Sequence, residues 1–199
     1  MTDVLRIIPL GGLGEVGKNM TVYELGDDVI VVDAGMAFPR DEHLGVDVIL
    51  PDFGYLRDKN VLAVVLTHAH EDHVGALPFL MREIRVREIW ATRLTLGLVK
   101  SKLDEHGLLR AAELREAEPE QGPIDIGPFK LEFIRMAHSI PDAVGIAIET
   151  SAGLVFHSGD WKLDHTPVDG LRTDVGRLAA LGNRGVDLLC GDSTNAERP

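Results

Sequence analysis

The sequence contains almost no cysteine and no long apolar run. Cys190 is the only cysteine among 199 residues, so no disulfide can form within the chain, and a reducing compartment, most simply the cytoplasm, is expected. The longest apolar runs, such as VLAVVLT, are too short to span a bilayer. The N-terminus also lacks the basic segment and the apolar stretch of a secretory signal. With 45% hydrophobic and 26% charged residues, the composition is that of a globular domain.

Positive charge is also scarce. The formal net charge is −12, so general electrostatic attraction to nucleic acid is not expected. The segment between Arg82 and Lys102 is an exception, because it holds six basic residues against two acidic ones. Such a run is typical of a solvated helix face, and contact with a phosphate backbone is the alternative interpretation.

The pattern of apolar residues predicts an α/β fold. We find no internal repeat and no low-complexity linker. The expected strands are residues 4–10, 20–25, 28–35, 61–67, 88–92, 129–137, 143–150, 154–160 and 186–192, and the expected helices are residues 74–84, 93–106 and 175–181. Strands come first and then alternate with helices, which indicates sheets packed together with helices outside. Residues 36–52 form a long irregular connection, and such connections are often functional.

A glycine-rich segment, GLGEVG from Gly12 to Gly17, follows the first expected strand. It matches G-x-G-x-x-G and, with Lys18, nearly matches a phosphate-binding loop, although Asn19 replaces the Ser or Thr that would hold magnesium. Both motifs require a helix to follow, because the N–H groups at its N-terminus bind the phosphates. A strand-like segment follows instead, so we reject nucleotide binding. The alternative is a tight turn that lets the backbone pass close to another part of the molecule.

The segment THAHEDHVGALP, residues 67–78, concentrates the chemistry of the chain. His68, His70, Asp72 and His73 lie between a buried strand and a helix. Residues i and i+2 of an extended segment point the same way, so His68 and His70 can share one ion, and Asp72 and His73 can face a second ion. Imidazole and carboxylate without thiolate suit zinc, manganese or another borderline ion. Two ions about 3.5–4 Å apart are a known catalytic arrangement.

Further ligands are expected at the ends of other strands. His138 follows FKLEFIRMA, and Asp160 ends LVFHSGD with a side chain able to bridge two ions. Asp33 ends VVDAG, and we predict that it holds a histidine tautomer or a turn behind the ligands. Glu71 is interpreted as solvated or as a supporting residue. No metal role is assigned to the remaining histidines, which are His43, His106, His157 and His165.

The pattern H-x-H-x-D-H after an apolar strand resembles the metallo-β-lactamase fold family, with its αββα sandwich. Six stretches together resemble the ribonuclease J family of its β-CASP branch: IIPLGGLGEVGKNM, FPRDEHLGVDVILPD, LTHAHEDHVGALP, AHSIPDAVG, SGDWKLD and GDSTNAERP. The resemblance runs nearly end to end. In that family a β-CASP domain interrupts the lactamase-like domain soon after the last stretch. The resemblance therefore implies that residues 1–199 are the N-terminal part of that domain, with the β-CASP domain and the remainder absent.

The resemblance also implies a set of ligands and a substrate. One ion takes His68, His70 and His138, the other takes Asp72 and His73, and Asp160 bridges them. The ions are most simply Zn²⁺, with Mn²⁺ or Mg²⁺ as alternatives. The implied partner is RNA, cut internally and from a monophosphorylated 5′ end, and the full-length protein is expected to form homo-oligomers. A last ligand histidine, supplied later in that family, is missing here, so these residues alone are expected to be weak or inactive.

The expected mechanism is attack of an activated water on a phosphodiester. Two cations lower the pKa of a bound water from about 15.7 toward about 7, and they stabilise charge on the phosphoryl oxygens. Asp72 or Asp160 can hold that water and accept its proton. Two other function classes remain open. One is a small-molecule hydrolase of esters, thioesters or lactones that uses the same metals, and the other is a fragment that binds metal without turnover.

Overall fold

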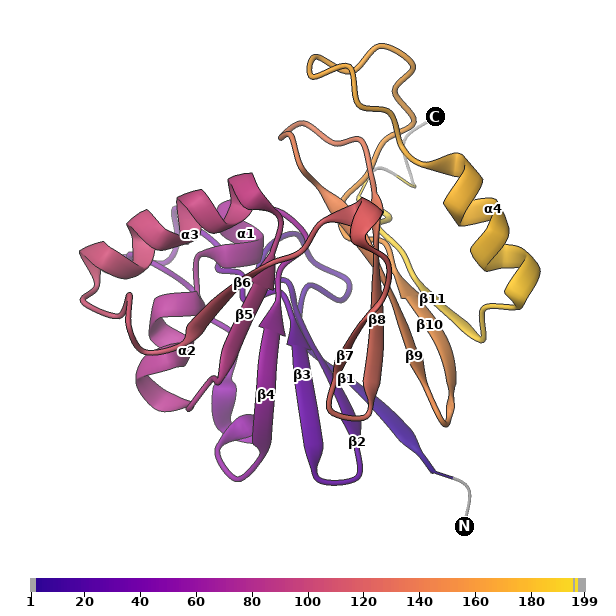
Figure 1. Ribbon diagram of the computed structural model, residues 1–199. Coiled ribbons are helices and arrows are strands. Elements are labelled where there is room, and N and C mark those ends of the chain that lie inside the picture. The colour runs from indigo at the N-terminus through magenta and orange to yellow at the C-terminus, as the bar shows by residue number, and fades with distance from the viewer. Residues whose placement is uncertain (1–2, 195, 197–199) are drawn as a thin grey trace.

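Two β-sheets form the centre of the fold, and helices cover both outer faces (Figure 1). The computed structural model describes residues 3–194 and residue 196. The first sheet has six strands in chain order: β1 (Leu5–Gly11), β2 (Met20–Leu25), β3 (Asp28–Val32), β4 (Asn60–Val65), β5 (Glu88–Ala91) and β6 (Glu113–Glu116). The second sheet has the order β11-β10-β9-β8-β7, formed by β7 (Ile124–Ile126), β8 (Phe129–Arg135), β9 (Val144–Thr150), β10 (Gly153–His157) and β11 (Leu188–Cys190).

Strand direction decides which loops meet at one edge. β1, β2 and β3 are antiparallel neighbours, whereas β3, β4, β5 and β6 run parallel. In the second sheet β8 and β10 are both antiparallel to β9, so they point the same way. The segments that follow β3 and β4 therefore leave the first sheet at one edge, and those that follow β8 and β10 leave the second sheet together.

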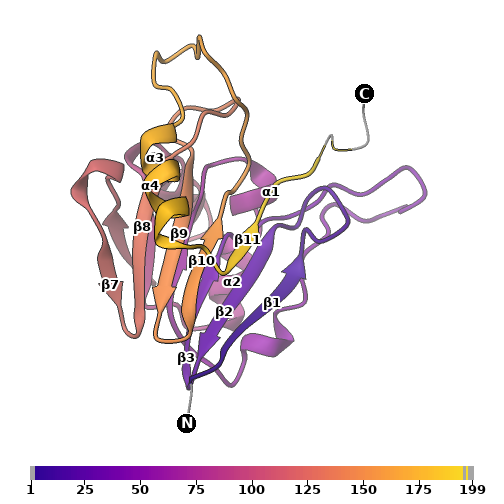
Figure 2. The same ribbon diagram turned by 90° about the vertical axis from the view of Figure 1, so that its right-hand side faces the viewer.

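The helices lie on the two outer faces of the sheet pair. α1 (Glu71–Val74), α2 (Leu77–Glu83) and α3 (Arg93–Glu105) lie on the side of the first sheet, and α4 (Val175–Arg184) covers the second sheet (Figure 2). Two short 3-10 helices, η1 (Phe53–Leu56) and η2 (Pro119–Gln121), interrupt connections. The order helix, sheet, sheet, helix confirms the expected αββα sandwich. Among the described residues, no helix combines the length and the apolar character needed to cross a membrane.

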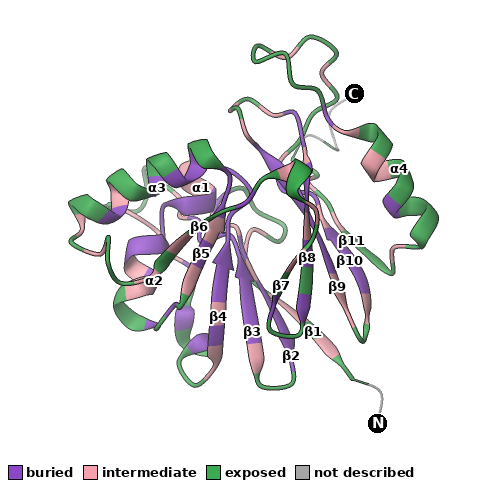
Figure 3. Ribbon diagram, in the orientation of Figure 1, coloured by how far each residue is buried: buried purple, intermediate pink, exposed green. Residues whose placement is uncertain are grey.

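The core consists of three apolar layers, which follow from the period of two along each strand. In β3, Val29 and Val31 face the helices α2 and α3, while Ile30 and Val32 face the second sheet. The layer between the sheets also contains Phe133 and other bulky residues. A smaller layer lies under α4. The central strands are buried along most of their length, and the helices expose their outward sides (Figure 3).

Local structure departs from the sequence expectation in a few places. The helix expected over residues 74–84 begins later, as α2, and the short helix α1 that precedes it was not expected. Pro78 lies in the first turn of α2, where its missing N–H costs no helical hydrogen bond. β6 and β7 lie in a polar, acidic segment and were not expected. The segment after Gly17 leads into strand β2 and not into a helix, which supports the rejection of nucleotide binding. Part of the GDSTNAERP stretch, residues 195 and 197–199, lies outside the described residues.

Two loops at the edge of the first sheet are hydrogen-bonded to each other along their backbones. The N–H of Ala34 donates to the carbonyl of His73 at 2.7 Å, and that of Met36 donates to the carbonyl of Glu71 at 3.1 Å. Gly35 lies between these bonds, where a Cβ atom would be 1.5 Å from the carbonyl oxygen of Asp72. Only glycine fits this approach, so the loop after β3 fixes the position of the histidine-rich loop after β4.

The substitution Gly35→Ala is therefore expected to lower the free energy of unfolding by at least about 3 kcal/mol, because one of the two backbones must move. Gly97→Ala is the matched control. Gly97 lies in α3, and a Cβ there would meet nothing within 4 Å, so the change should stabilise the chain by about 0.5–1 kcal/mol. Urea denaturation of both variants measures the difference, and equal midpoints would contradict the proposed contact.

Candidate metal centre

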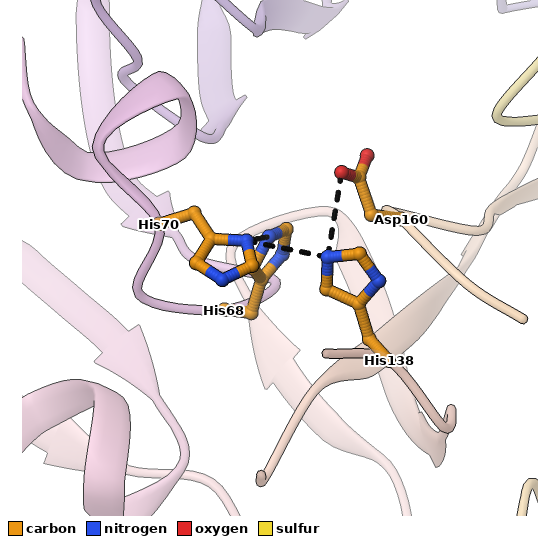
Figure 4. Close-up of side chains that lie close together, drawn as sticks. All are labelled: His68, His70, His138 and Asp160. Atoms are coloured by element: carbon orange, nitrogen blue, oxygen red, sulfur yellow. Dashed lines mark hydrogen bonds and ion pairs between the residues drawn. The ribbon is translucent and has the colours of Figure 1, made fainter. Parts of the chain in front are cut away.

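Three histidines and one carboxylate converge at the edge where the two sheets meet (Figure 4). His68 and His70 come from the loop after β4, His138 follows β8, and Asp160 follows β10. Nε2 of His68 lies 3.1 Å from Nδ1 of His70, which lies 3.2 Å from Nε2 of His138. Nε2 of His138 lies 3.6 Å from Oδ2 of Asp160. Three ring nitrogens therefore face one another across a space that a cation would fill.

A second group lies beside the first. Nε2 of His73 is 3.6 Å from Oδ2 of Asp72 and 3.3 Å from Oδ1 of Asp160. Asp160 thus belongs to both groups, with Oδ2 toward His138 and Oδ1 toward His73. One ligand atom from each member of a group lies within 4.8 Å of those of the other members. A carboxylate in this place has the geometry of a bridge between two ions.

Asp33 and Thr67 orient two of the histidines from behind. Oδ2 of Asp33 lies 2.7 Å from Nδ1 of His73, and Oγ1 of Thr67 lies 3.0 Å from Nδ1 of His68. The backbone N–H of Thr67 donates to Oδ1 of Asp33 at 2.8 Å, and its hydroxyl lies 2.9 Å from Oδ2 of Asp33. A hydroxyl that donates to a carboxylate can accept a hydrogen bond from Nδ1–H. This network assigns the Nδ1–H tautomer and leaves the Nε2 lone pair facing the site.

Burial and charge give the members of the centre different pKa values. Burial, reinforced by the charge of His73, lowers the pKa of His68 to about 2. Burial opposes the charged form of His73 too, but the carboxylates of Asp33 and Asp160 outweigh it and raise the pKa of His73 to about 10. Burial disfavours ionised Asp160, yet the hydrogen bond and charge of His73 lower its pKa to about 2. A proton and a cation therefore compete for Nε2 of His73.

The residues expected from the sequence fall into two sets. The six predicted ligands come together in the two groups, and Asp33 lies behind His73. Glu71 points elsewhere and forms an ion pair with Lys102 at 2.8 Å. The histidines without a predicted metal role, His43, His106, His157 and His165, are absent from both groups. Arg82 to Lys102 spans α2, β5 and α3, so its bases do not form a single helix face.

Sequence reasoning missed three residues that contact the ligands, and one of them is Ser139, whose Oγ lies 3.4 Å from Nε2 of His138. Thr67 immediately precedes His68. Its hydroxyl, directly before two candidate ligands, could have indicated a residue that orients them. Asn19 places its amide nitrogen 3.1 Å from Nε2 of His73 and 3.3 Å from Oδ2 of Asp72. Asn19 stands 53 residues before Asp72, at the end of the glycine-rich segment, and no sequence signal linked the two.

The geometry agrees with a comparison against protein families. The model described as the metallo-beta-lactamase superfamily matches residues 13–192. The chain belongs to the metallo-β-lactamase superfamily. Membership implies divalent metal ions, and the donors fit, because neutral imidazoles with carboxylates and no thiolate are a ligand set for borderline divalent cations.

Two similar sequences are named ribonuclease J. The chain is 48% identical over 197 residues to ribonuclease J of Helicobacter pylori, a match that covers 98% of this chain and 28% of the relative. It is 47% identical over 205 residues to ribonuclease J of Thermus thermophilus, covering 99% of this chain and 36% of the relative. The chain thus spans about a third of the length of these relatives.

Solved structures with the metallo-β-lactamase fold resemble this one at low sequence identity. A protein of unknown function from Enterococcus faecalis superposes with a TM-score of 0.73 at 18% identity, over 98% of this chain and 51% of that chain. The short form of human tRNase Z superposes with a TM-score of 0.55 at 15% identity, over 77% of this chain and 68% of that chain. At such identities the likeness concerns the fold alone.

The double variant His68→Ala, His70→Ala is expected to lose the bound cation of the first group, because two of its three imidazoles are removed. Elemental analysis of the purified chain measures metal content against the wild type. The double variant His43→Ala, His106→Ala removes two histidines outside both groups and should retain the wild-type content. Equal metal content in all three proteins would show that the cluster does not bind metal.

The variant Asp33→Ala is expected to weaken cation binding by about 10–100-fold, since Nδ1 of His73 loses its acceptor. It should also destabilise the chain by about 1–3 kcal/mol, because the buried N–H of Thr67 is left unpaired. Asp28→Ala is the control, because Asp28 begins the same strand β3 and accepts from Asn60. Competition with a chelator measures affinity, and an equal loss in both variants would exclude a specific role for Asp33.

Proposed function

We propose that this chain carries the metal centre of a ribonuclease that hydrolyses RNA phosphodiester bonds, both internally and from the 5′ end. The observation that carries the proposal is the pair of ligand groups sharing Asp160. It occurs in a chain that is 47–48% identical to proteins named ribonuclease J. The relatives supply the substrate class, and the site supplies the chemistry that such a substrate requires.

The ligand sets of the two groups are unequal. His68, His70, His138 and Asp160 offer three nitrogens and one oxygen to one cation, which suits Zn²⁺. Asp72, His73 and Asp160 offer one nitrogen and two oxygens to the other, a harder set that also suits Mn²⁺ or Mg²⁺. We propose two divalent cations, most simply Zn²⁺ in both groups. The second cation, with three ligands from this chain, should bind more weakly than the first.

Bound cations would supply Lewis acidity, which makes a water molecule a stronger nucleophile at neutral pH and stabilises charge on phosphoryl oxygens. The chain's own residues divide the remaining tasks. The side chains of Asp72 and Asp160 are 32% and 25% exposed, so their carboxylates can hold a water and accept its proton. His68 and His73 are buried and held at Nδ1, so they keep the site rigid.

The wider protein is also part of the proposal. Residues 1–199 correspond to the N-terminal part of a metallo-β-lactamase-like domain, and a β-CASP domain and a later ligand histidine belong to the remainder. With an incomplete second group, these residues alone would be a poor nuclease, since a misplacement of about 1 Å can cost about 100-fold in rate. RNA is the proposed partner, the cytoplasm the proposed compartment, and self-association a property of the longer protein.

The test is the degradation of a 5′-monophosphorylated single-stranded RNA by a longer chain that includes residues 1–199, at matched Zn²⁺ or Mn²⁺. Asp72→Ala is expected to reduce the rate by about 100-fold or more, because a ligand and proton acceptor is lost. Asp104→Ala, which removes an exposed carboxylate of α3, should have the wild-type rate. Intact RNA combined with efficient hydrolysis of a lactone or thioester would support the small-molecule alternative instead.

A further inference from the structure

The glycine-rich segment between β1 and β2 lies against the metal centre. The backbone N–H of Asn19 donates to the carbonyl of Asp72 at 3.0 Å, and the N–H of Gly35 donates to the carbonyl of Asn19 at 2.9 Å. The N–H of Lys18 donates to the carbonyl of Met36 at 3.1 Å. The end of this segment therefore sits between the loop after β3 and the histidine-rich loop after β4.

The side chain of Asn19 reaches the second ligand group. Its Nδ2 atom lies 3.3 Å from Oδ2 of Asp72 and 3.1 Å from Nε2 of His73. Asp72 is the more exposed of these two ligands, and a short exposed side chain can adopt several rotamers unless a neighbour holds it. Thr67 and Asp33 orient His68 and His73 through hydrogen bonds at Nδ1. The Asn19 amide is placed to orient the Asp72 carboxylate through a hydrogen bond at Oδ2.

We propose that Asn19 is a positioning residue for the second cation, because its amide holds the Asp72 carboxylate beside His73. This inference rests on the proposed metal centre. Nε2 of His73 cannot accept the amide hydrogen when either a proton or a cation occupies it. Asp72 then remains the acceptor for Nδ2, and its Oδ2 atom, which also lies 3.6 Å from Nε2 of His73, has a second lone pair to offer the cation.

The position of Asn19 also explains why residue 12, in the segment that resembles a nucleotide-binding motif, is a glycine. A Cβ atom on Gly12 would lie 2.4 Å from Oδ1 of Asn19, so the chain passes directly against the amide. Gly12 has φ +85° and Gly14 has φ +71°, a region that favours glycine. A Cβ on Gly14 would meet nothing within 4 Å. Gly12 is therefore required both for the turn and for the placement of Asn19, whereas Gly14 is required for the turn alone.

The experiment is a calorimetric titration of Zn²⁺ into the metal-free chain. The wild type is expected to show two binding steps, a tighter one for the four-ligand group and a weaker one for Asp72, His73 and Asp160. In Asn19→Ala the backbone bonds of residue 19 can persist, and only the amide is lost. The second step should weaken by about 10–100-fold, as is typical when a residue that orients a ligand is removed, and the first step should stay unchanged.

Asn60→Ala is the matched control. The amide of Asn60 donates to Oδ1 of Asp28 at 2.6 Å, and the two residues begin β4 and β3, at the opposite end from the metal centre. This variant loses an asparagine–carboxylate hydrogen bond of the same kind, and both Zn²⁺ steps should match the wild type. A purely structural effect of losing such a bond would appear in this control as well.

A second pair of variants tests the same role with Asn19 intact. Gly12→Ala and Gly14→Ala impose similar backbone strain, but only the former pushes on the Asn19 amide. Gly12→Ala should weaken the second step as Asn19→Ala does, and Gly14→Ala should not. In the double variant Gly12→Ala, Asn19→Ala, the two losses should not add, because both act through one side chain.

The outcomes separate this inference from the proposal on which it rests. A wild type that takes up fewer than two cations overturns the two-ion centre, and the role of Asn19 with it. Two steps in the wild type with unchanged or tighter second-step binding in Asn19→Ala overturn the role of Asn19 alone. Equal weakening of both steps, or the same weakening in Asn60→Ala, would reduce Asn19 to a structural residue.

Discussion

The buried carboxylate of Asp33 is the constraint on which the centre depends. A carboxylate taken out of water is costly unless hydrogen bonds replace its hydration. Here the backbone N–H and the hydroxyl of Thr67 and the ring of His73 supply those bonds. Asp33 follows β3 with φ 63°, Thr67 follows β4, and His73 lies in α1. One side chain therefore joins three segments, and each segment must keep its place for the carboxylate to stay satisfied.

Strand direction makes this arrangement possible. Because β3 and β4 are parallel, Asp33 and the loop of His68 leave the first sheet at one edge. Because β8 and β10 are both antiparallel to β9, His138 and Asp160 leave the second sheet at one edge. The apolar layer between the sheets, which includes Ile30, Val65 and Phe133, brings these edges together. Three loops that are distant in sequence then bring the candidate ligands to one site, and a fourth, after β3, brings Asp33 behind them.

The sequence predicted two parts of the centre. One is the group of candidate ligands in the loop after β4, and the other is the pair His138 and Asp160 at the ends of later strands. The spacing of His68, His70, Asp72 and His73 indicates that their side chains point toward the same region. The apolar run before them identifies a buried strand. His138 and Asp160 required the further assumption that the ends of two strands meet, which the order of the second sheet supports. The pattern of a single sequence does not show that the segment between β1 and β2 touches the loop after β4. For that reason Asn19 was not predicted, although its own segment had been singled out.

The same limit explains the secondary structure that was missed. β6 has a polar sequence, ELRE, and is mostly exposed, so no apolar alternation marks it. It is a strand because it lies beside β5, whose Glu88 to Ala91 pair with Glu113 to Glu116, and tertiary pairing overrides weak local preference. The start of α2 at Leu77 was readable from Pro78, since proline favours the first turn of a helix.

The charge balance of the centre gives a physical reason for metal in a chain of net charge −12. Without cations, the site contains the carboxylates of Asp33, Asp72 and Asp160, and a phosphodiester would be repelled. His73, whose pKa is raised to about 10 by the neighbouring carboxylates, offsets only one of these negative charges at neutral pH. Two divalent cations outweigh three carboxylates, so the loaded site would be locally positive within an acidic surface. Such a centre would attract a phosphate group to the place where the cations lie. In the proposed centre, the partly exposed carboxylates of Asp72 and Asp160 would hold cations, and the buried Asp33 would orient His73 for the same task.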